Sequence, residues 1–269
     1  MTENKPFNKN DFKFFIDLIT KAGALARDIQ VHGMTVRRKD DTSIVTQADL
    51  QVQDLLIKEI SGRFPGAVFV HEENFDISKR QMRDDALSFI IDPIDGTAMY
   101  SMHLPIWCIS IGVFRGYSPL YGFVFSPGCG MLFHNDDDHA YLNGHVLEVD
   151  KNIGVDNETN IFIASEFPRK FTLTAPGKIR NLGSSALHAC LLADNRRNRS
   201  LAFIGQSYLW DWAGAIPVIL RAGGQIKYLS GRDLDYREIV NNDYKFPEYV
   251  VAYSCEDFDL IKNYFVEKI

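Results

Sequence analysis

The first quarter of the chain carries apolar residues at helical spacing in two stretches. Over residues 11–31 they recur every three or four positions, which predicts an amphipathic helix that Asn10 or Asp11 is placed to cap. A second helix is predicted over residues 47–63. The inward positions are Phe15, Leu18, Ile19, Ala22, Leu25, Ala26 and Ile29 in the first helix, and Val52, Leu55, Leu56 and Ile60 in the second.

Short apolar runs follow and predict strands. They cover residues 67–70, 87–91, 107–114 and 120–125. The last two runs flank a turn that contains Gly116 and Pro119, so they are expected to pair as a β-hairpin.

The second half alternates between the two kinds of pattern. Mixed strands and helices in both halves predict an α+β fold of layered sheets covered by helices. A soft boundary near residue 150 divides the chain into lobes 1–150 and 151–269 of one compact unit. The strands are expected at 161–165, 201–204, 225–229 and 249–253, and the helices at 185–193, from Trp210 onward and at 257–266.

Composition removes several classes of function. The 269 residues are 46% hydrophobic and 24% charged, as in ordinary globular proteins, and the net charge of −6 does not attract nucleic acid. Four scattered cysteines favour a reducing cytoplasm over a zinc or disulfide framework. No signal-peptide core or membrane-length apolar run is present. We therefore expect a cytoplasmic protein with neither nucleic acid nor a membrane as its partner.

The segment "FIIDPIDGTAMY" (89–100) ends an apolar run in two carboxylates, Asp92 and Asp95. A haloacid-dehalogenase-type phosphatase needs a second Asp two positions after the first, where this chain has Ile94, and the spacing does not fit an EF-hand. Pro93 is expected to stop the strand and fix a turn in which both carboxylates converge. Such oxygen ligands suit Mg²⁺. Gly96 and Thr97 then open a helix whose free N–H groups suit a phosphate.

Four segments together resemble the inositol monophosphatase family. They are "DPIDGT" (92–97), "WDWAGAIPVILRAGG" (210–224), "VFVHEEN" (68–74) and "IVTQADLQVQDLL" (44–56). The resemblance covers nearly the whole chain and includes "SIGVFRGYSPLYGFVFSP" and "AYLNGHVL". It implies an αβαβα sandwich of two mixed sheets with helices between and outside, a magnesium-dependent, lithium-sensitive phosphomonoesterase activity, and a homodimer.

The resemblance also implies a ligand set for two or three Mg²⁺ ions, with Mn²⁺ as a substitute. Glu72 corresponds to the Glu that binds the first metal and holds the attacking water. Asp92 corresponds to the bridging ligand, and Ile94 to a backbone carbonyl ligand. Asp95 and Asp211 correspond to the remaining ligands of the second metal, and both also join the substrate site.

The remaining site residues carry over in the same way. Thr97, with Asp49 behind it, corresponds to a Thr–Asp pair that orients and deprotonates the water. The N–H groups of Gly96 and Thr97 correspond to the phosphate contacts, and Gly183 and Ser184 to a turn against the rest of the substrate. The implied reaction is in-line hydrolysis without a covalent phosphoenzyme.

Several of these residues also fit purely structural roles. Asp49 completes a capping pattern with Thr46, and Asp211 suits a helix N-terminus. Glu73 is expected to be a solvated neighbour of Glu72, and His71 to lie at the surface or behind the ligands. The paired tryptophans 210 and 212 are expected in the core, and the basic run 195–199 in a solvated turn.

The substrate is expected to be a small phosphate monoester, either an inositol-1-phosphate-like polyol or a sugar phosphate. Family members that act on inositol phosphates carry an acidic residue about seven positions before the Asp of "WD". The corresponding position here falls near Ile204, and nothing acidic lies between Leu201 and Trp210, although Gln206 or Ser207 could substitute as the acceptor. The run "AIPVILRAGG", which contains Pro217, resembles the histidinol-phosphate phosphatase branch of the family. The basic 195–199 run could bind the second phosphate of adenosine 3′,5′-bisphosphate. A non-catalytic metal-binding regulator is a further alternative.

Overall fold

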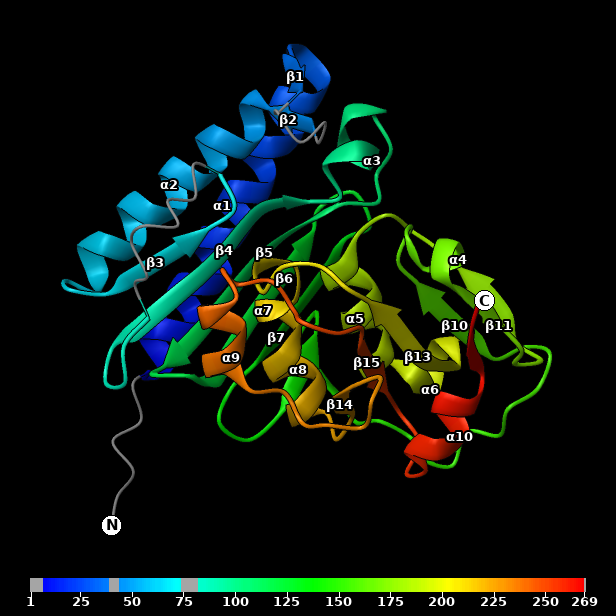
Figure 1. The fold of residues 1–269 in the computed structure, drawn as a ribbon. Helices are drawn as coiled ribbons and strands as arrows, with labels where there is room; N and C mark the ends of the chain where they lie inside the picture. The colour runs from blue at the N-terminus through cyan, green and yellow to red at the C-terminus, as the bar shows by residue number, and fades with distance from the viewer. Residues whose placement is uncertain (1–6, 39–43, 74–81, 269) are drawn as a thin grey trace.

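The computed structural model describes residues 7–38, 44–73 and 82–268. Its helices and sheets alternate in layers, and Figure 1 shows helices α1 (Lys9–His32) and α2 (Gln47–Arg63) side by side over one face of the larger sheet. The second layer is that sheet, and the fourth is a smaller sheet. The third layer, between them, holds helices α5 (Ser185–Ala193), α7 (Trp210–Ala213) and α8 (Ala215–Arg221). Short helices cover the far face of the smaller sheet. The expected αβαβα fold is therefore confirmed.

The larger sheet has seven strands within the described residues, in the order β3-β4-β5-β6-β7-β8-β9. The β3–β4 pair is parallel and the other pairs are antiparallel. The strands are β3 (Val68–His71), β4 (Leu87–Asp95), β5 (Cys108–Arg115), β6 (Ser118–Ser126), β7 (Met131–Asn135), β8 (Ala140–Leu142) and β9 (His145–Leu147).

Helices α1 and α2 bury their predicted apolar faces against this sheet. Phe15 and Phe89 stack at 5.6 Å between α1 and β4, and Phe15 stacks with Phe123 of β6 at 4.9 Å. The N-cap of α1 is Asn8, which exchanges hydrogen bonds with the first turn in a capping box. The expected caps, Asn10 and Asp11, lie inside the helix, and the Asp11 carboxylate instead accepts the Asn8 N–H.

The smaller sheet has the order β12-β10-β13-β15-β14. Strands β12, β10 and β13 are parallel, so their carboxyl ends meet at one edge, while β15 is antiparallel to both of its neighbours. The strands are β10 (Asn160–Ile163), β12 (Lys178–Arg180), β13 (Ser200–Gly205), β14 (Gln225–Tyr228) and β15 (Val250–Tyr253).

A separate hydrophobic core lies on the outer face of this smaller sheet. Phe167 of α4 (Phe167–Lys170) and Ile261 of α10 (Phe258–Asn263) pack there against the sheet. A two-stranded pair, β11 (Phe171–Leu173) with β16 (Phe265–Glu267), flanks them. The last helix was expected over 257–266; it ends at Asn263 because the chain then pairs as a strand.

A pair of glycines brings the middle helices close to the larger sheet. Gly112 and Gly122 lie directly opposite each other on β5 and β6. A Cβ at Gly112 would lie 2.5 Å from the Ala213 carbonyl oxygen, and one at Gly122 would lie 1.8 Å from that of Gly214. These contacts place α7 (Trp210–Ala213) and α8 (Ala215–Arg221) directly on the sheet, with α5 (Ser185–Ala193) beside them.

Two predicted boundaries were wrong because strands continue through prolines. Strand β4 was expected to stop at Pro93, yet pairing resumes at Asp95 opposite Cys108 after an irregularity. Pro119 was expected in the hairpin turn, yet it lies within β6, and Gly116 and Tyr117 form the turn. The other elements are β1 (Val36–Arg38), β2 (Ile44–Thr46), α3 (Thr97–Ser101), α6 (Asn195–Asn198) and α9 (Tyr236–Asn241).

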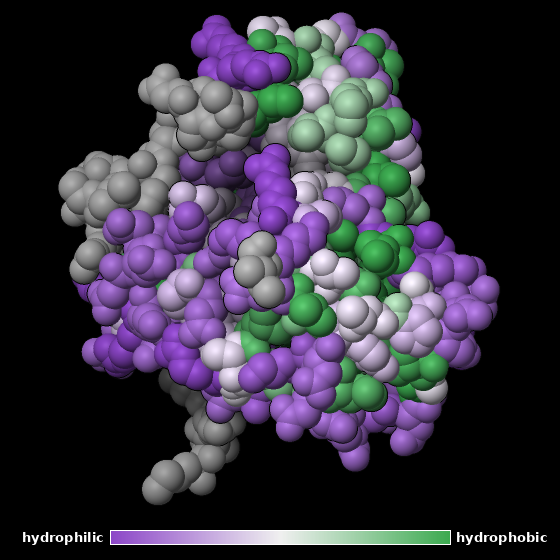
Figure 2. All heavy atoms as spheres, turned by 45° about the vertical axis from the view of Figure 1, so that its right-hand side comes forward, coloured by the Kyte–Doolittle hydropathy of each residue, from purple (hydrophilic) through white to green (hydrophobic). Residues whose placement is uncertain are grey.

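The middle core draws residues from both halves of the chain, for example Ile90 and Cys108 with Trp212 and Phe203. The division into lobes near residue 150 stays a prediction. Figure 2 shows hydrophilic residues over much of one face, with hydrophobic ones gathered toward one side of it. In the described ranges, no helix has both the length and the apolar character to cross a bilayer.

Candidate active site

Three carboxylates from distant segments meet where the two sheets face each other. Asp92 and Asp95 come from the carboxyl end of β4, and Asp211 comes from the first turn of α7. Each offers an oxygen within 4.8 Å of the others. Asp92 and Asp95 are buried, and Asp211 is half-buried. The fold thus brings together three of the four acidic residues predicted as metal ligands, and the fourth, Glu72, acts on Asp92 through its charge.

The electrostatics of this cluster favour a bound cation. Burial, followed by the charges of Glu72 and Asp95, holds the pKa of Asp92 well above its ordinary range. Burial raises the pKa of Asp95 to about 6, and burial with the charge of Asp95 raises that of Asp211 to about 7. Mutually repelling buried carboxylates are costly unless protonated or paired with a cation. Their hard oxygen donors fit a divalent cation such as Mg²⁺.

Asp95 is also held by the start of α5. The Ser184 hydroxyl and the Ala186 N–H each donate to its Oδ2 at 2.6 Å, and the Ser185 N–H donates to its Oδ1 at 3.1 Å. The Cys108 thiol lies 3.7 Å from Oδ2. These contacts orient Asp95, and because Oδ1 accepts only the Ser185 N–H, that oxygen keeps a lone pair for a cation. This anchoring of α5 was not expected from sequence.

The predicted Thr–Asp pair lies on the other side of β4. The Thr97 hydroxyl donates to the Ile94 carbonyl at 2.9 Å and lies 3.4 Å from Asp49 Oδ1. Asp49 also accepts the Thr46 N–H at 2.7 Å, which completes the capping box of α2. Burial raises the pKa of Asp49 to about 6. Asp49 therefore fills the capping role and lies next to Thr97.

Glu72 follows β3 in a loop that Gln53 and His71 hold in place. Neither role was expected from sequence. Gln53 of α2 donates to the Glu73 carbonyl at 3.3 Å and accepts the Glu73 N–H at 3.2 Å. The ring nitrogen Nδ1 of His71 contacts the same carbonyl at 2.7 Å. Glu73, expected to be solvated, is only 3% exposed because this clamp draws it inward.

Gly183 and Ser184, the predicted substrate turn, lie against Gly96, whose N–H was predicted to contact the phosphate. Gly96 has φ of 94°, and a Cβ there would lie 3.0 Å from the Gly183 carbonyl oxygen and 3.3 Å from Ser184 Cβ. Only glycine suits both the left-handed backbone and this close approach. Gly96 also caps α3 without a side chain, so the fold brings Gly96, Thr97, Gly183 and Ser184 around one point.

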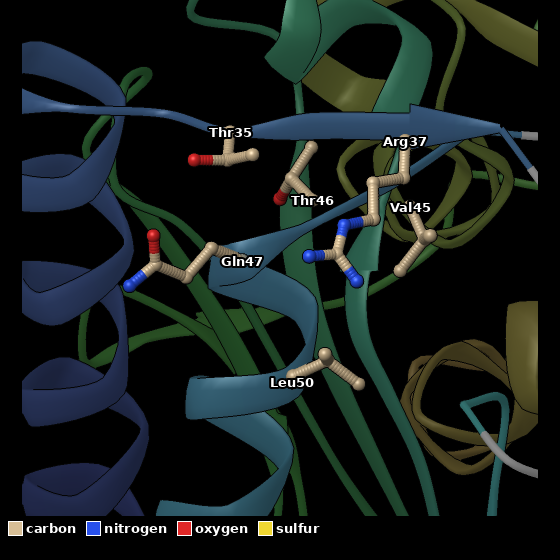
Figure 3. Close-up of a pocket in the computed structure, with 6 residues that line it drawn as sticks. All are labelled: Thr35, Arg37, Val45, Thr46, Gln47 and Leu50. Carbon is tan, nitrogen blue, oxygen red and sulfur yellow. The ribbon is translucent and has the colours of Figure 1, made fainter.

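A separate pocket of about 180 Å³ lies between the β1–β2 hairpin and the first turn of α2. Figure 3 shows the Arg37 side chain extending from β1 toward Leu50 and the start of α2. Its lining contains a cation and no carboxylate among the described residues, so it does not suit a metal. Its Thr46 also donates to Asp49, which places the pocket behind the Thr97–Asp49 pair.

The two tryptophans beside Asp211 are buried, as expected. Pro217 lies in the first turn of α8, because the helix breaks at Gly214. First-turn N–H groups have no partner within the helix, so a proline there loses little. Pro217 is thus accounted for by local structure and no longer favours the histidinol-phosphate branch.

The basic run 195–199 was expected to form a solvated turn; it forms the short helix α6 and its end, with Arg196 and Arg197 exposed as expected and Asn195 buried. Its arginines pair with carboxylates: Arg196 with Glu148, Arg197 with Asp194 and Arg199 with Asp156. It follows the far end of α5, whose other end contacts Asp95. The nine residues of α5 span ~13 Å. This separation between the run and Asp95 is too long for the two phosphates of adenosine 3′,5′-bisphosphate, which share one ribose.

The layered fold and the acidic centre define an α+β protein equipped to bind a cation at the meeting edge of two mixed sheets. The sequence profile of the inositol monophosphatase family matches residues 8–256. The chain belongs to this family, and it is a phosphoric monoester hydrolase. Family members are metal-dependent, which agrees with the acidic cluster.

Curated relatives agree with this assignment, and solved structures agree with the fold. Inositol monophosphatase 1 of Solanum lycopersicum is 29% identical over 234 residues, covering 82% of this chain and 85% of that protein. The Thermotoga maritima IMPase structure superposes with a TM-score of 0.78 at 23% identity, covering 94% and 96% of the two chains. A staphylococcal IMPase-I in complex with products also gives 0.78, at 18% identity over 98% and 99%.

Proposed function

We propose that this chain is a magnesium-dependent phosphatase that hydrolyses a small polyol or sugar phosphate resembling inositol 1-phosphate. The observation that carries the proposal is the convergence of Asp92, Asp95 and Asp211 within 4.8 Å in a buried setting. In this proposal Glu72, Asp92, Asp95, Asp211 and the Ile94 carbonyl hold two or three Mg²⁺ ions. When bound, the cations neutralise phosphate charge and make water a better nucleophile.

The residues beside the cluster then position the reactants. Thr97 orients the attacking water, and Asp49 accepts a proton through the Thr97 hydroxyl, from which its Oδ1 lies 3.4 Å. A pKa of about 6 leaves Asp49 mostly ionised at neutral pH and able to act as a base. The uncapped N–H groups of Gly96 and Thr97 bind the phosphate, while Gly183 and Ser184 contact the rest of the substrate.

The proposed reaction transfers the phosphoryl group from the ester oxygen to water in line, with no covalent phosphoenzyme. The protein's task is positioning and charge neutralisation. Lithium is expected to inhibit, as it does in the family generally. We also keep a cytoplasmic location and a homodimer as predictions.

The test is release of inorganic phosphate from four esters, with and without Mg²⁺. The panel is inositol 1-phosphate, histidinol phosphate, fructose 1,6-bisphosphate and adenosine 3′,5′-bisphosphate. We expect magnesium-dependent release, fastest from inositol 1-phosphate, and none from Asp92→Asn, with the fold retained. Release without metal would contradict the proposal, and no release from any ester would favour the non-catalytic regulator.

A further inference from the structure

The structure explains why the expected acidic residue is missing near position 204. Ile204 lies in the interior of β13, fully buried with Phe167 and Ile261 in the outer core of the smaller sheet. A residue at 204 therefore points away from the acidic cluster. An acceptor for substrate hydroxyls has to come from another segment.

Glu166 lies where such an acceptor is needed. It follows the carboxyl end of β10, next to the carboxyl end of the parallel strand β13, and ligands of such sheets bind at this edge. The Gln206 N–H donates to Glu166 Oε1 at 3.2 Å. The Gln206 amide in turn donates to the carbonyls of Phe246 and Pro247 at 3.1 and 3.2 Å. The loop that supports Glu166 is thus itself fixed.

The second oxygen of Glu166 is available to a ligand. Among the residues that the structure describes, Oε2 has no protein donor. The side chain is half-buried, and the Gln206 N–H that it accepts belongs to the loop leading from β13 to Asp211 in the first turn of α7. A carboxylate therefore lies close to the metal cluster, on the side of the smaller sheet.

Polar groups that suit hydroxyls lie beside Glu166. The Asn181 amide donates to the Ser165 hydroxyl at 3.0 Å and accepts the Gly183 N–H at 2.9 Å. These contacts link the loop after β10 to the predicted substrate turn at Gly183 and Ser184. A polyol, which presents both donors and acceptors, matches this set better than a simple cation does.

We propose that Glu166 is a specificity-determining residue that accepts hydrogen bonds from hydroxyls of the leaving group and so selects polyol phosphates. This inference rests on the proposed function. It replaces the missing acidic residue of β13 with one from the β10–α4 loop. Without it, substrate hydroxyls would be desolvated without an acceptor.

The test compares the magnesium-loaded protein with Glu166→Ala and Glu166→Gln. Each is assayed with inositol 1-phosphate, histidinol phosphate and 4-nitrophenyl phosphate, for kcat/KM and for equilibrium binding. Glu158→Ala is the matched control, since Glu158 precedes the opposite end of β10 and pairs at the surface with Lys178.

Glu166→Ala is expected to lower kcat/KM and binding for inositol 1-phosphate about tenfold or more. Glu166→Gln, which keeps an acceptor oxygen, is expected to lose less. 4-Nitrophenyl phosphate, which has no hydroxyls to recognise, is expected to change by less than about twofold in both variants. Glu158→Ala is expected to match the parent protein.

Equal losses for both esters, or no loss for inositol 1-phosphate, would overturn the inference. A loss confined to histidinol phosphate would also overturn it, because Glu166 would then recognise an ammonium group. If the parent protein hydrolyses none of the esters, the hydrolase proposal fails on its own. The binding comparison still decides the role of Glu166 in that case.

Discussion

The Ser184 hydroxyl donates to the Asp95 carboxylate at 2.6 Å, a hydrogen bond between residues 89 positions apart in sequence. It couples the strand that carries two of the acidic residues to the helix that begins at the substrate turn. Ser184 also caps α5 by accepting the Leu187 N–H. The two halves of the site are therefore connected directly.

Ser184→Ala is expected to raise the pKa of Asp95 further, because the lost hydrogen bond favours the charged form. Loss of activity at acidic pH should then begin at a higher pH than in the parent protein. Stability should fall by about 1–3 kcal/mol. A pH–rate profile and thermal unfolding measure both effects. Ser185→Ala is the control, since Ser185 reaches Asp95 through its backbone N–H; an equal shift in that variant would contradict the account.

Gly122→Ala is expected to destabilise the protein strongly. The added Cβ would overlap the Gly214 carbonyl oxygen and push α7 and α8 away from the larger sheet. Overpacking of this kind costs about 1–3 kcal/mol or more. Because α7 carries Asp211, affinity for Mg²⁺ should fall as well. Thermal unfolding and metal titration test this, with Gly154→Ala, which meets nothing within 4 Å, expected to behave like the parent. Unchanged metal affinity would count against this positioning role.

Gln53→Leu is expected to lower kcat by loosening the loop that carries Glu72. The variant leaves the Glu73 backbone N–H and carbonyl without the Gln53 side chain, at a cost of about 1–3 kcal/mol in stability. Steady-state kinetics as a function of Mg²⁺ concentration should show a raised metal requirement. Gln51→Leu, on the exposed face of the same helix, should have little effect. A normal metal requirement in Gln53→Leu would show that the clamp is unimportant.

Elements were predicted correctly where the apolar positions of the sequence pattern are also the positions that the fold buries. Helix α2 was predicted at its observed bounds, 47–63, and helix α5 at 185–193. The N-terminus of α1 was misplaced because Asn8 caps it, two residues before the expected cap. The strands through Pro93 and Pro119 were cut short because sheet partners, which local sequence does not contain, hold both prolines in strand geometry.

Only the site residues that lie within family motifs could be predicted from the sequence. Asp92, Asp95 and Asp211 were named from their motifs, and the structure brings them together. The clamp of Gln53 on Glu73 and the hydrogen bond from Gln206 to Glu166 join segments 20 and 40 residues apart. No periodicity or spacing marks such pairs, because each residue alone resembles an ordinary polar side chain.

The metal-free protein should lose stability as pH rises from about 4 to about 7. Asp95, Asp211 and Asp49 have pKa values of about 6, 7 and 6 in the folded protein, above those in the unfolded chain. The folded state therefore binds more protons over this range, and the resulting stability disappears as the groups ionise.

Mg²⁺ should consequently stabilise the protein much more at pH 8 than at pH 5, because protons compete for the same oxygens. Thermal unfolding in chelator and in excess Mg²⁺ at both values measures this difference. Asp233→Asn, at a surface carboxyl that is 89% exposed, is the control and should leave the difference unchanged. An equal shift at both pH values would argue that the cluster binds no cation.

The most direct measurement is anomalous diffraction from a crystal soaked in Mn²⁺. We predict at least one anomalous peak between the carboxylates of Asp92, Asp95 and Asp211, at oxygen distances typical of metal coordination, and no such peak in Asp92→Asn. A well-ordered parent crystal in excess Mn²⁺ with no peak among these three side chains would contradict the account.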